Sequence, residues 1–175
     1  MSFAKTTEAR EGREHQCYSK ATGARLVAGC IALNADKTKV IMITSTNSKS
    51  KWILPKGGIE ADEAGDYLAT ALRETWEEAG ITGKLTLKLG VVEDKRPPKK
   101  WNTKNEYGIM IPRTEFHFYE MQVEELAKEW PESNKRERRW CTYTEAKQEL
   151  EKAKRPELVD ALNSCSIDKQ FKEST

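Results

Sequence analysis

Hydrophobic residues recur along this chain in short runs, separated by turn-forming and charged residues. The apolar run Arg25–Leu33, bounded by Gly23 and by Asn34–Asp36, predicts a strand, and Val40–Thr44 predicts its hairpin partner. Further extended segments are predicted at Trp52–Leu54, Leu85–Val92, Thr114–Val123 and Trp140-Cys141, with Gly57-Gly58 in a loop. The strands therefore predict a sheet.

Helical signals alternate with these strands. A helix is predicted from Asp66 to Ala79, because Asp66 suits an N-cap and Gly80 a C-cap. A long polar loop is predicted from Asp94 to Ile111. Further helical segments are predicted at Glu124–Glu129, Thr144–Ala153 and Pro156–Cys165. Together the elements predict an α/β fold in which helices pack on a mixed sheet.

The length of 175 residues fits a single domain, predicted here as 1–175 with its core at about 22–165 and polar tails. No apolar run approaches the roughly 20 residues that span a bilayer, and the N-terminus lacks the apolar stretch of a signal peptide. No two of the four cysteines form a C-x-x-C pair. We expect a cytoplasmic protein, with the nucleus also open, and no membrane partner.

The net charge is only +2, but the charges are unevenly distributed. Acidic residues crowd between Glu60 and Glu78, and basic residues cluster at Lys95–Lys100, Lys135–Arg139 and Lys152–Arg155. Separate acidic and basic blocks suit a site that holds metal ions together with a polyanion, although solvated surface gives the same pattern. We expect a small polyphosphorylated partner rather than DNA.

Three glutamates carry the clearest chemical signal. On the predicted helix, Glu74, Glu77 and Glu78 follow the spacing i, i+3, i+4 and share one face. Like charges at this spacing repel one another, and a hard divalent cation would reverse that cost. Gly57-Gly58 lets the backbone approach a ligand closely, so a carbonyl of Lys56 or Gly57 could add a metal ligand. The alternative is an acidic, solvated helix face.

The segment from Gly57 to Ile81 resembles the Nudix box, G-x5-E-x7-R-E-U-x-E-E-x-G-U, in which U is apolar. Here Gly57 and Glu63 are separated by five residues, and nine residues precede R-E-T-W-E-E-A-G-I. The spacer before Arg73 is thus two residues longer, and Thr75 replaces an apolar residue. The longer spacer leaves the role of Glu63 open.

The resemblance extends beyond the box to the fungal diphosphoinositol polyphosphate phosphohydrolases, which also hydrolyse diadenosine polyphosphates. The stretches that resemble them include AREGREHQCYS, TGARLVAGCIAL, KWILPKGG, VEDKRPPKKW, PRTEFHFYE and AKRPEL. The resemblance implies a Nudix fold, with a mixed β-sheet sandwiched between α-helices. It also implies hydrolysis of inositol pyrophosphates, diadenosine polyphosphates and inorganic polyphosphate with Mg²⁺, Mn²⁺ being the alternative metal.

The resemblance also suggests roles for individual residues. Glu77 is the candidate base, and Glu74 and Glu78, with the carbonyl of Lys56 or Gly57, are the candidate metal ligands. Arg73 and Gly80 are expected to be structural. The candidates for binding substrate phosphates are Arg25, Ser45, Lys56, Arg136 and Arg155.

Two other functions stay open at this point. One is a Nudix hydrolase specific for a dinucleoside polyphosphate or for the 5′ cap of RNA, which would favour aromatic stacking on a broad basic surface. Trp52 and Trp76 could stack on a base, although packing is the favoured interpretation of Trp76. The other is a sensor that binds inositol pyrophosphates without cleaving them, and such a protein should have lost a glutamate of the triplet.

Overall fold

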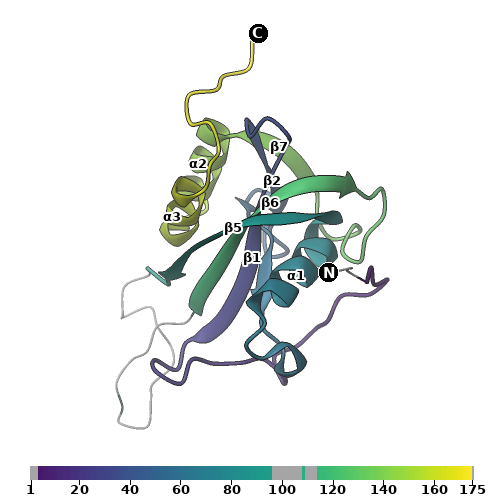
Figure 1. Ribbon diagram of the computed structural model, residues 1–175, viewed down its shortest axis with the longest axis vertical. Coiled ribbons are helices and arrows are strands. Elements are labelled where there is room, and N and C mark those ends of the chain that lie inside the picture. The colour runs from purple at the N-terminus through teal and green to yellow at the C-terminus, as the bar shows by residue number, and fades with distance from the viewer. Residues whose placement is uncertain (1–3, 96–107, 109–113, 175) are drawn as a thin grey trace.

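The computed structural model describes residues 4–95, 108 and 114–174 (Figure 1). Within these residues the strands are β1 (Arg25–Leu33), β2 (Lys39–Thr44), β3 (Trp52–Ile53), β4 (Lys56–Gly58), β5 (Ile81–Glu93), β6 (Thr114–Leu126) and β7 (Arg138–Thr142). The helices are α1 (Tyr67–Ala79), α2 (Tyr143–Lys152) and α3 (Pro156–Ser164), and a short 3-10 turn covers Ala61–Glu63. In this part of the chain, no helix is both long and apolar enough to cross a membrane.

Strand β1 lies at the centre of a mixed sheet with the order β3-β2-β1-β6-β5. It pairs in parallel with β6, from Arg25 opposite Thr114 to Leu33 opposite Gln122, and antiparallel with β2 and β4. Residues 27–33 of β1 are all buried, as expected of a strand that is covered on both faces. The mixed sheet predicted from the sequence is confirmed.

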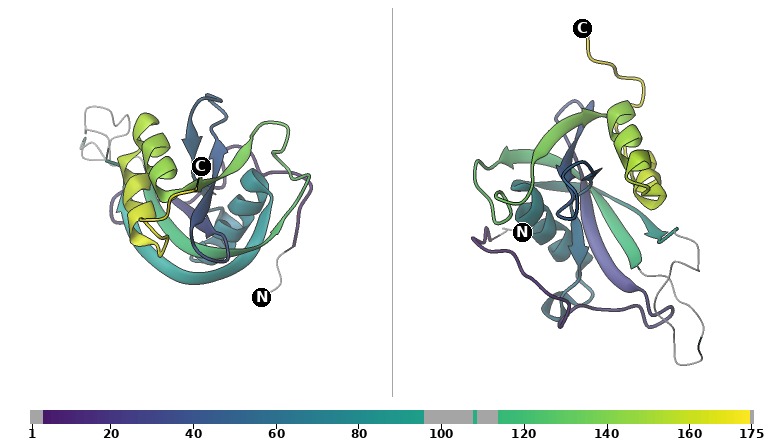
Figure 2. Two further views of the ribbon diagram at one scale, coloured as in Figure 1. Left: turned by 90° about the horizontal axis from the view of Figure 1, so that it is seen from above. Right: turned by 180° about the vertical axis from the view of Figure 1, so that it is seen from behind.

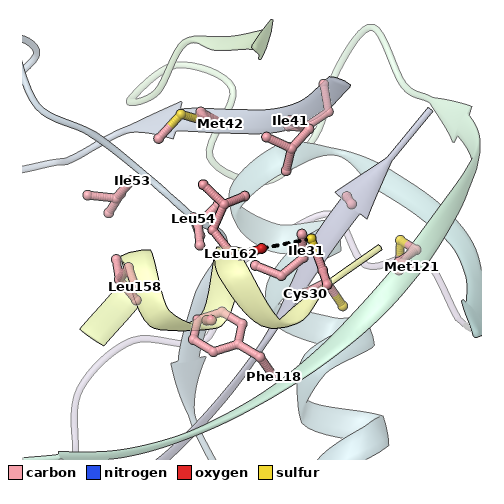
Figure 3. Close-up of a cluster of buried hydrophobic side chains, with 14 of the residues drawn as sticks. Cys30, Ile31, Ile41, Met42, Ile53, Leu54, Phe118, Met121, Leu158 and Leu162 are labelled. Atoms are coloured by element: carbon pink, nitrogen blue, oxygen red, sulfur yellow. Dashed lines mark hydrogen bonds between the residues drawn. The ribbon is translucent and has the colours of Figure 1, made fainter. Parts of the chain in front are cut away.

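Helix α1 covers one face of this sheet, and α2 and α3 cover the other (Figures 1 and 2). On the α3 side, Leu158 and Leu162 pack with Phe118 and Leu54 in the main hydrophobic cluster (Figure 3). On the α1 side, the buried thiol of Cys30 donates a hydrogen bond to the carbonyl of Ala71 at 3.6 Å. Because apolar side chains are buried on both faces of the sheet, α1 is fixed against it. The sheet therefore gives Glu74, Glu77 and Glu78 a rigid support.

Two predicted elements were wrong, and both errors come from tertiary pairing. Gly57-Gly58 is not in a loop but in β4, where Gly57 lies opposite Ala28 and Gly58 opposite Val27. The predicted helical turn Glu124–Glu129 does not form, because β6 continues to Leu126. There it pairs with the start of β5, which begins at Ile81 rather than Leu85. Partners distant in sequence override local propensity in both cases.

The predicted loop from Asp94 to Ile111 lies largely outside the described residues, and so does most of the basic block Lys95–Lys100. The two strands that flank this segment meet where the amide of Asp94 donates to the carbonyl of Thr114 at 3.0 Å.

Candidate active site

Helix α1 carries Glu74, Glu77 and Glu78 and is capped at both ends. The side chain of Asp66 accepts a hydrogen bond from the amide of Ala69 at 3.0 Å. At the other end, Gly80 has a φ of 67°, and its amide donates to the carbonyl of Trp76 at 2.9 Å. A Cβ on Gly80 would lie 2.7 Å from the ring of Trp130, so both conformation and space require glycine here. The caps fix where the helix begins and ends.

The buried guanidinium of Arg73 connects this helix to β4 and to the 3-10 turn. Its Nε and Nη2 donate to Glu63 at 2.8 and 3.0 Å, and Nη2 also donates to the carbonyl of Gly58 at 3.0 Å. Its Nη1 donates to Glu74 and Glu77, each at 2.9 Å. Burial alone would lower the pKa of Arg73, but these carboxylates outweigh burial and raise it. Arg73 therefore contacts two of the three glutamates of the box, Glu74 and Glu77.

Glu63 is the anchor of Arg73. Besides the two guanidinium contacts, its carboxylate accepts from the hydroxyl of Thr70 at 2.9 Å and from the amide of Glu60 at 3.2 Å. The longer spacer begins after Glu63, the last residue of the 3-10 turn Ala61–Glu63. It contains Asp66, the residue that caps α1. The longer spacer leaves Glu63 within reach of Arg73, which answers the question that the sequence left open.

Glu74, which is part-buried, and Glu78, which is buried, form a carboxylate pair that faces β4. The Glu74 carboxylate lies directly over Gly57, where an added Cβ would be 2.2 Å from both carboxylate oxygens. Oε1 of Glu78 accepts from the amide of Lys56 at 3.2 Å, and Oε2 pairs with Arg136 at 3.1 Å. The structure therefore brings together Lys56, Gly57, Glu74 and Glu78, the four residues predicted to hold metal.

The electrostatics of this pair are unfavourable without a further cation. Burial and the charge of Glu78 hold the pKa of Glu74 well above its usual range. Burial raises the pKa of Glu78 to about 7, although Arg136 and Lys56 oppose the rise. Both shifts mean that the folded protein disfavours two ionised carboxylates here, because desolvation and like charge both penalise them.

The residues present fit a divalent cation. The Glu74 carboxylate occupies the space that a side chain at position 57 would take, which brings its oxygens against β4, and oxygen donors suit Mg²⁺. Among the described residues, no three His, Cys, Asp or Glu side chains gather into a metal-holding group. A site here would hence use two carboxylates, completed by a main-chain carbonyl of β4 and by water, as Mg²⁺ commonly does.

Glu77 lies apart from the pair. Only 1 % of it is exposed, and its Oε2 accepts from Arg73. Its Oε1 accepts from the main-chain amide of Arg10 at 3.0 Å. Burial raises the pKa of Glu77, and the charge of Arg73 opposes this. Glu77 thus shares Arg73 with Glu74, but unlike the pair it also accepts from the N-terminal segment.

Four predicted phosphate-binding cations gather beside the carboxylate pair. Burial lowers the pKa of Lys56 to about 8, and the charges of Arg155, Arg136 and Arg25 add to the shift, so each of these arginines lies near Lys56. Arg136 also donates to the carbonyl of Thr44 at 2.9 Å, which places Ser45, the fifth candidate, next to this cluster. A group of cations around one lysine suits a polyanionic ligand.

Some contacts of the site had no signal in the sequence. Gln16 accepts from Arg25 at 2.9 Å, and Glu132 pairs with Arg136 at 2.9 Å. Arg10 lies in the N-terminal stretch AREGREHQCYS that carries the resemblance, but its amide contact with Glu77 depends on the path of the backbone. The contact between Arg10 and Glu77 joins residues 67 positions apart in the chain, so no local pattern predicts it.

The two candidate stacking residues are both engaged with protein groups. Trp76 is 5 % exposed, and its Nε1 donates to the carbonyl of Thr6 at 2.9 Å. The ring of Trp52 lies 4.3 Å from the guanidinium carbon of Arg139. Packing, the favoured interpretation of Trp76, is confirmed.

A family model described as the NUDIX domain matches residues 23–162. The chain belongs to the Nudix family. The box from Gly57 to Ile81 holds the three glutamates Glu74, Glu77 and Glu78, and Glu63, Arg73 and Gly80 stand at its fixed positions. The sandwich fold expected from the resemblance is confirmed with the family.

Several relatives are similar along much of the chain. Nudix hydrolase 21 of Arabidopsis thaliana is 37% identical over 78% of this chain and 65% of its own length. Nudix hydrolase 16 of the same plant is 36% identical over 88% and 85%. Human diphosphoinositol polyphosphate phosphohydrolase 3-alpha is 32% identical over 68% and 65%. The match thus covers less than two thirds of the length of the first and third of these relatives.

Solved structures agree on the fold. A Nudix hydrolase from Nitrosomonas europaea superposes with a TM-score of 0.60 at 12% identity, over 81% of this chain and 87% of that one. The Ap4A hydrolase of C. elegans superposes with a TM-score of 0.53 at 20% identity, over 81% and 95%. At these identities the likeness extends to the arrangement of strands and helices only.

Proposed function

We propose that this Nudix protein is a divalent-metal-dependent hydrolase of phosphoanhydride bonds, with inositol pyrophosphates as its main substrates. Diadenosine polyphosphates and inorganic polyphosphate are proposed as further substrates. The observation that carries the proposal is the carboxylate pair Glu74 and Glu78 beside the cations Lys56, Arg25, Arg136 and Arg155. Hydrolysing a dense polyphosphate requires both a metal site and a cluster of cations.

The proposed metal is Mg²⁺, with Mn²⁺ as the alternative. Glu74, Glu78 and a carbonyl of Lys56 or Gly57 would hold it, and when bound it would neutralise phosphate charge and polarise the phosphoryl group. The pKa of Glu78, raised to about 7, fits this assignment, because a bound cation would restore the charged carboxylate.

The remaining chemistry is assigned to the side chains of this chain. The phosphates that are not cleaved would be bound by the four cations Arg25, Lys56, Arg136 and Arg155. These contacts would fix the orientation of the inositol ring. Glu77 would accept a proton from the attacking water, whose oxygen forms the new bond to phosphorus while the bridging P–O bond breaks. Burial raises the pKa of Glu77, which strengthens it as a base near neutral pH.

The name of the human relative, a diphosphoinositol polyphosphate phosphohydrolase, supports this choice of substrate at 32% identity. The cap-specific alternative is less well supported, because Trp76 is buried against Thr6 and Trp52 already contacts Arg139. The sensor alternative is disfavoured, since all three glutamates of the box are present. A cytoplasmic location, with the nucleus as the alternative, stays a prediction.

Substrate choice is tested by measuring phosphate release with Mg²⁺ from a diphosphoinositol polyphosphate and from a diadenosine polyphosphate, at matched concentrations. The proposal predicts a higher kcat/KM for the inositol substrate. A higher kcat/KM for the diadenosine substrate would support the nucleotide-specific alternative. Tight binding of the inositol substrate without turnover would support the sensor.

A further inference from the structure

Residues 5–16, here called the N-terminal strap, run alongside α1 before the chain enters the sheet. Figures 1 and 2 show this segment in purple beside the helix. Three contacts attach it: Thr6 to Trp76 at 2.9 Å, Arg10 to Asp62 at 2.7 Å, and the carbonyl of His15 to the amide of Ala61 at 2.6 Å. The strap is thus attached near both of its ends and in its middle.

In the middle of the strap, the main chain reaches the candidate base. The amide of Arg10 donates to Oε1 of Glu77 at 3.0 Å, while Arg73 donates to Oε2 at 2.9 Å. Each carboxylate oxygen therefore has one N–H donor from a different part of the chain. Hydrogen bonds from N–H groups to a carboxylate are short and directional, so two of them define its orientation.

Arg73 alone would orient Glu77 poorly. Its guanidinium is shared among Glu63, Glu74, Glu77 and the carbonyl of Gly58. A glutamate side chain has several rotatable bonds, and a single shared donor leaves the carboxylate free to turn about that contact. The strap supplies the second donor to Glu77, the amide of Arg10. A main-chain amide has no side-chain rotamers, so it keeps its position as long as the strap stays attached.

We propose that the main-chain amide of Arg10 is a positioning group for catalysis, and that the strap belongs to the active site because it orients Glu77. This inference rests on the proposed hydrolase function, in which Glu77 is the base. A base held in a fixed direction points its remaining lone pairs at one place, where the attacking water must sit.

The variant that tests this is Arg10→Pro, because proline removes the amide donor. We expect kcat to fall about tenfold or more, while KM stays within about twofold, because the donor acts on the base and not on the bound phosphates. Asp62→Asn removes the ion pair to the Arg10 side chain but keeps the amide, and Glu8→Pro places a proline at an exposed position of the strap. Both variants keep the Arg10 amide, so the kcat of each should exceed that of Arg10→Pro at least fivefold.

Arg10→Ala separates the two parts of the residue further. It loses the side chain but keeps the amide donor, so its kcat should exceed that of Arg10→Pro at least fivefold, on the order of one lost hydrogen bond. Equal kcat values for the two variants would overturn the proposal, because the loss would then belong to the side chain.

A second measurement needs neither metal nor substrate. Amide hydrogen exchange of the metal-free protein should show Arg10 protected, and Glu77→Ala should remove that protection without unfolding α1. Free exchange of the Arg10 amide in the wild-type protein would overturn the proposal, whatever the activity. If the wild-type protein hydrolyses none of the proposed substrates, the hydrolase function fails, and with it the catalytic role given to Arg10, even where the amide is protected.

Discussion

Glu74 occupies the space in which residue 57 would carry a side chain: a Cβ on Gly57 would lie 2.0 Å from the carboxyl carbon of Glu74. A strand residue and a helical carboxylate are thus in direct contact, and the absence of a side chain on one sets the position of the other. The glycine of the box has a steric role here, in addition to any ligand its carbonyl provides.

This contact predicts the effect of Gly57→Ala. The methyl group would displace the end of a flexible glutamate rather than backbone, so we expect the free energy of unfolding to change by less than about 2 kcal/mol. Activity should fall at least tenfold, because the carboxylate leaves the proposed metal site. Urea unfolding and phosphate release measure the two effects.

Gly90→Ala is the matched control for that variant. Nothing lies within 4 Å of a Cβ at Gly90, which is in the same sheet but outside the site. It should leave kcat/KM unchanged. A Gly57→Ala protein with the activity of Gly90→Ala would show that the position of Glu74 does not matter for the reaction.

The raised pKa values of Glu74 and Glu78 predict how the metal-free protein responds to pH. The pKa of Glu78 rises from 4.5 to about 7 on folding, so between these values the folded state binds more protons than the unfolded state. Stability contributed by this group is therefore present at low pH and is lost as pH rises through that window. With a chelator present, urea unfolding should give a smaller free energy near pH 7.5 than near pH 5.

Glu78→Gln provides the comparison for the pH experiment. It cannot ionise, so its free energy of unfolding should change less between the two pH values than that of the wild-type protein. A wild-type profile as flat as that of Glu78→Gln would mean that the carboxylate pair is not strained when empty of metal.

Metal binding should offset the cost of burying the charges of Glu74 and Glu78 next to each other. Adding Mg²⁺ near neutral pH should raise the thermal midpoint of the wild-type protein, and at ten times Kd the gain is about 1.4 kcal/mol. The double variant Glu74→Gln/Glu78→Gln should show no such shift in differential scanning calorimetry. A shift retained in the double variant would place the cation elsewhere.

The cation cluster predicts selective losses of binding. Arg155→Gln should weaken the binding of a highly phosphorylated inositol about tenfold, and that of a simple nucleotide less, because the former depends on more phosphate contacts. Calorimetric titration of the two ligands into a Glu77→Gln background measures both affinities. Lys88→Gln, at an exposed position of β5, is the control. Equal losses for the two ligands would contradict the role given to Arg155.

The sequence alone predicted much of this site because the box is a local pattern. The caps Asp66 and Gly80 and the spacing of Glu74, Glu77 and Glu78 all act within one helix, so period and capping rules suffice to predict α1. Strand β1 was likewise predicted with its observed bounds, Arg25–Leu33, because it is a continuous apolar run between turn residues.

The parts that could not be predicted depend on partners far away in the chain. Gly57 and Gly58 have low intrinsic strand propensity, yet they pair with β1 where larger residues would collide with Glu74 and Gln16. Residues 124–126 look helical, but they extend β6 because β5 pairs with them. The role of Glu63 depended on how a longer spacer folds, and the contact from Arg10 depended on the course of the backbone.

We propose above that this Nudix protein hydrolyses inositol pyrophosphates with Glu77 as the base. The most direct test is the rate of phosphate release from a diphosphoinositol polyphosphate at saturating Mg²⁺, for the wild-type protein and Glu77→Gln. We expect turnover by the wild-type protein and a kcat at least a hundredfold lower for the variant, in line with loss of a general base. Equal rates for the two proteins, with Glu77→Gln folded, would contradict the account.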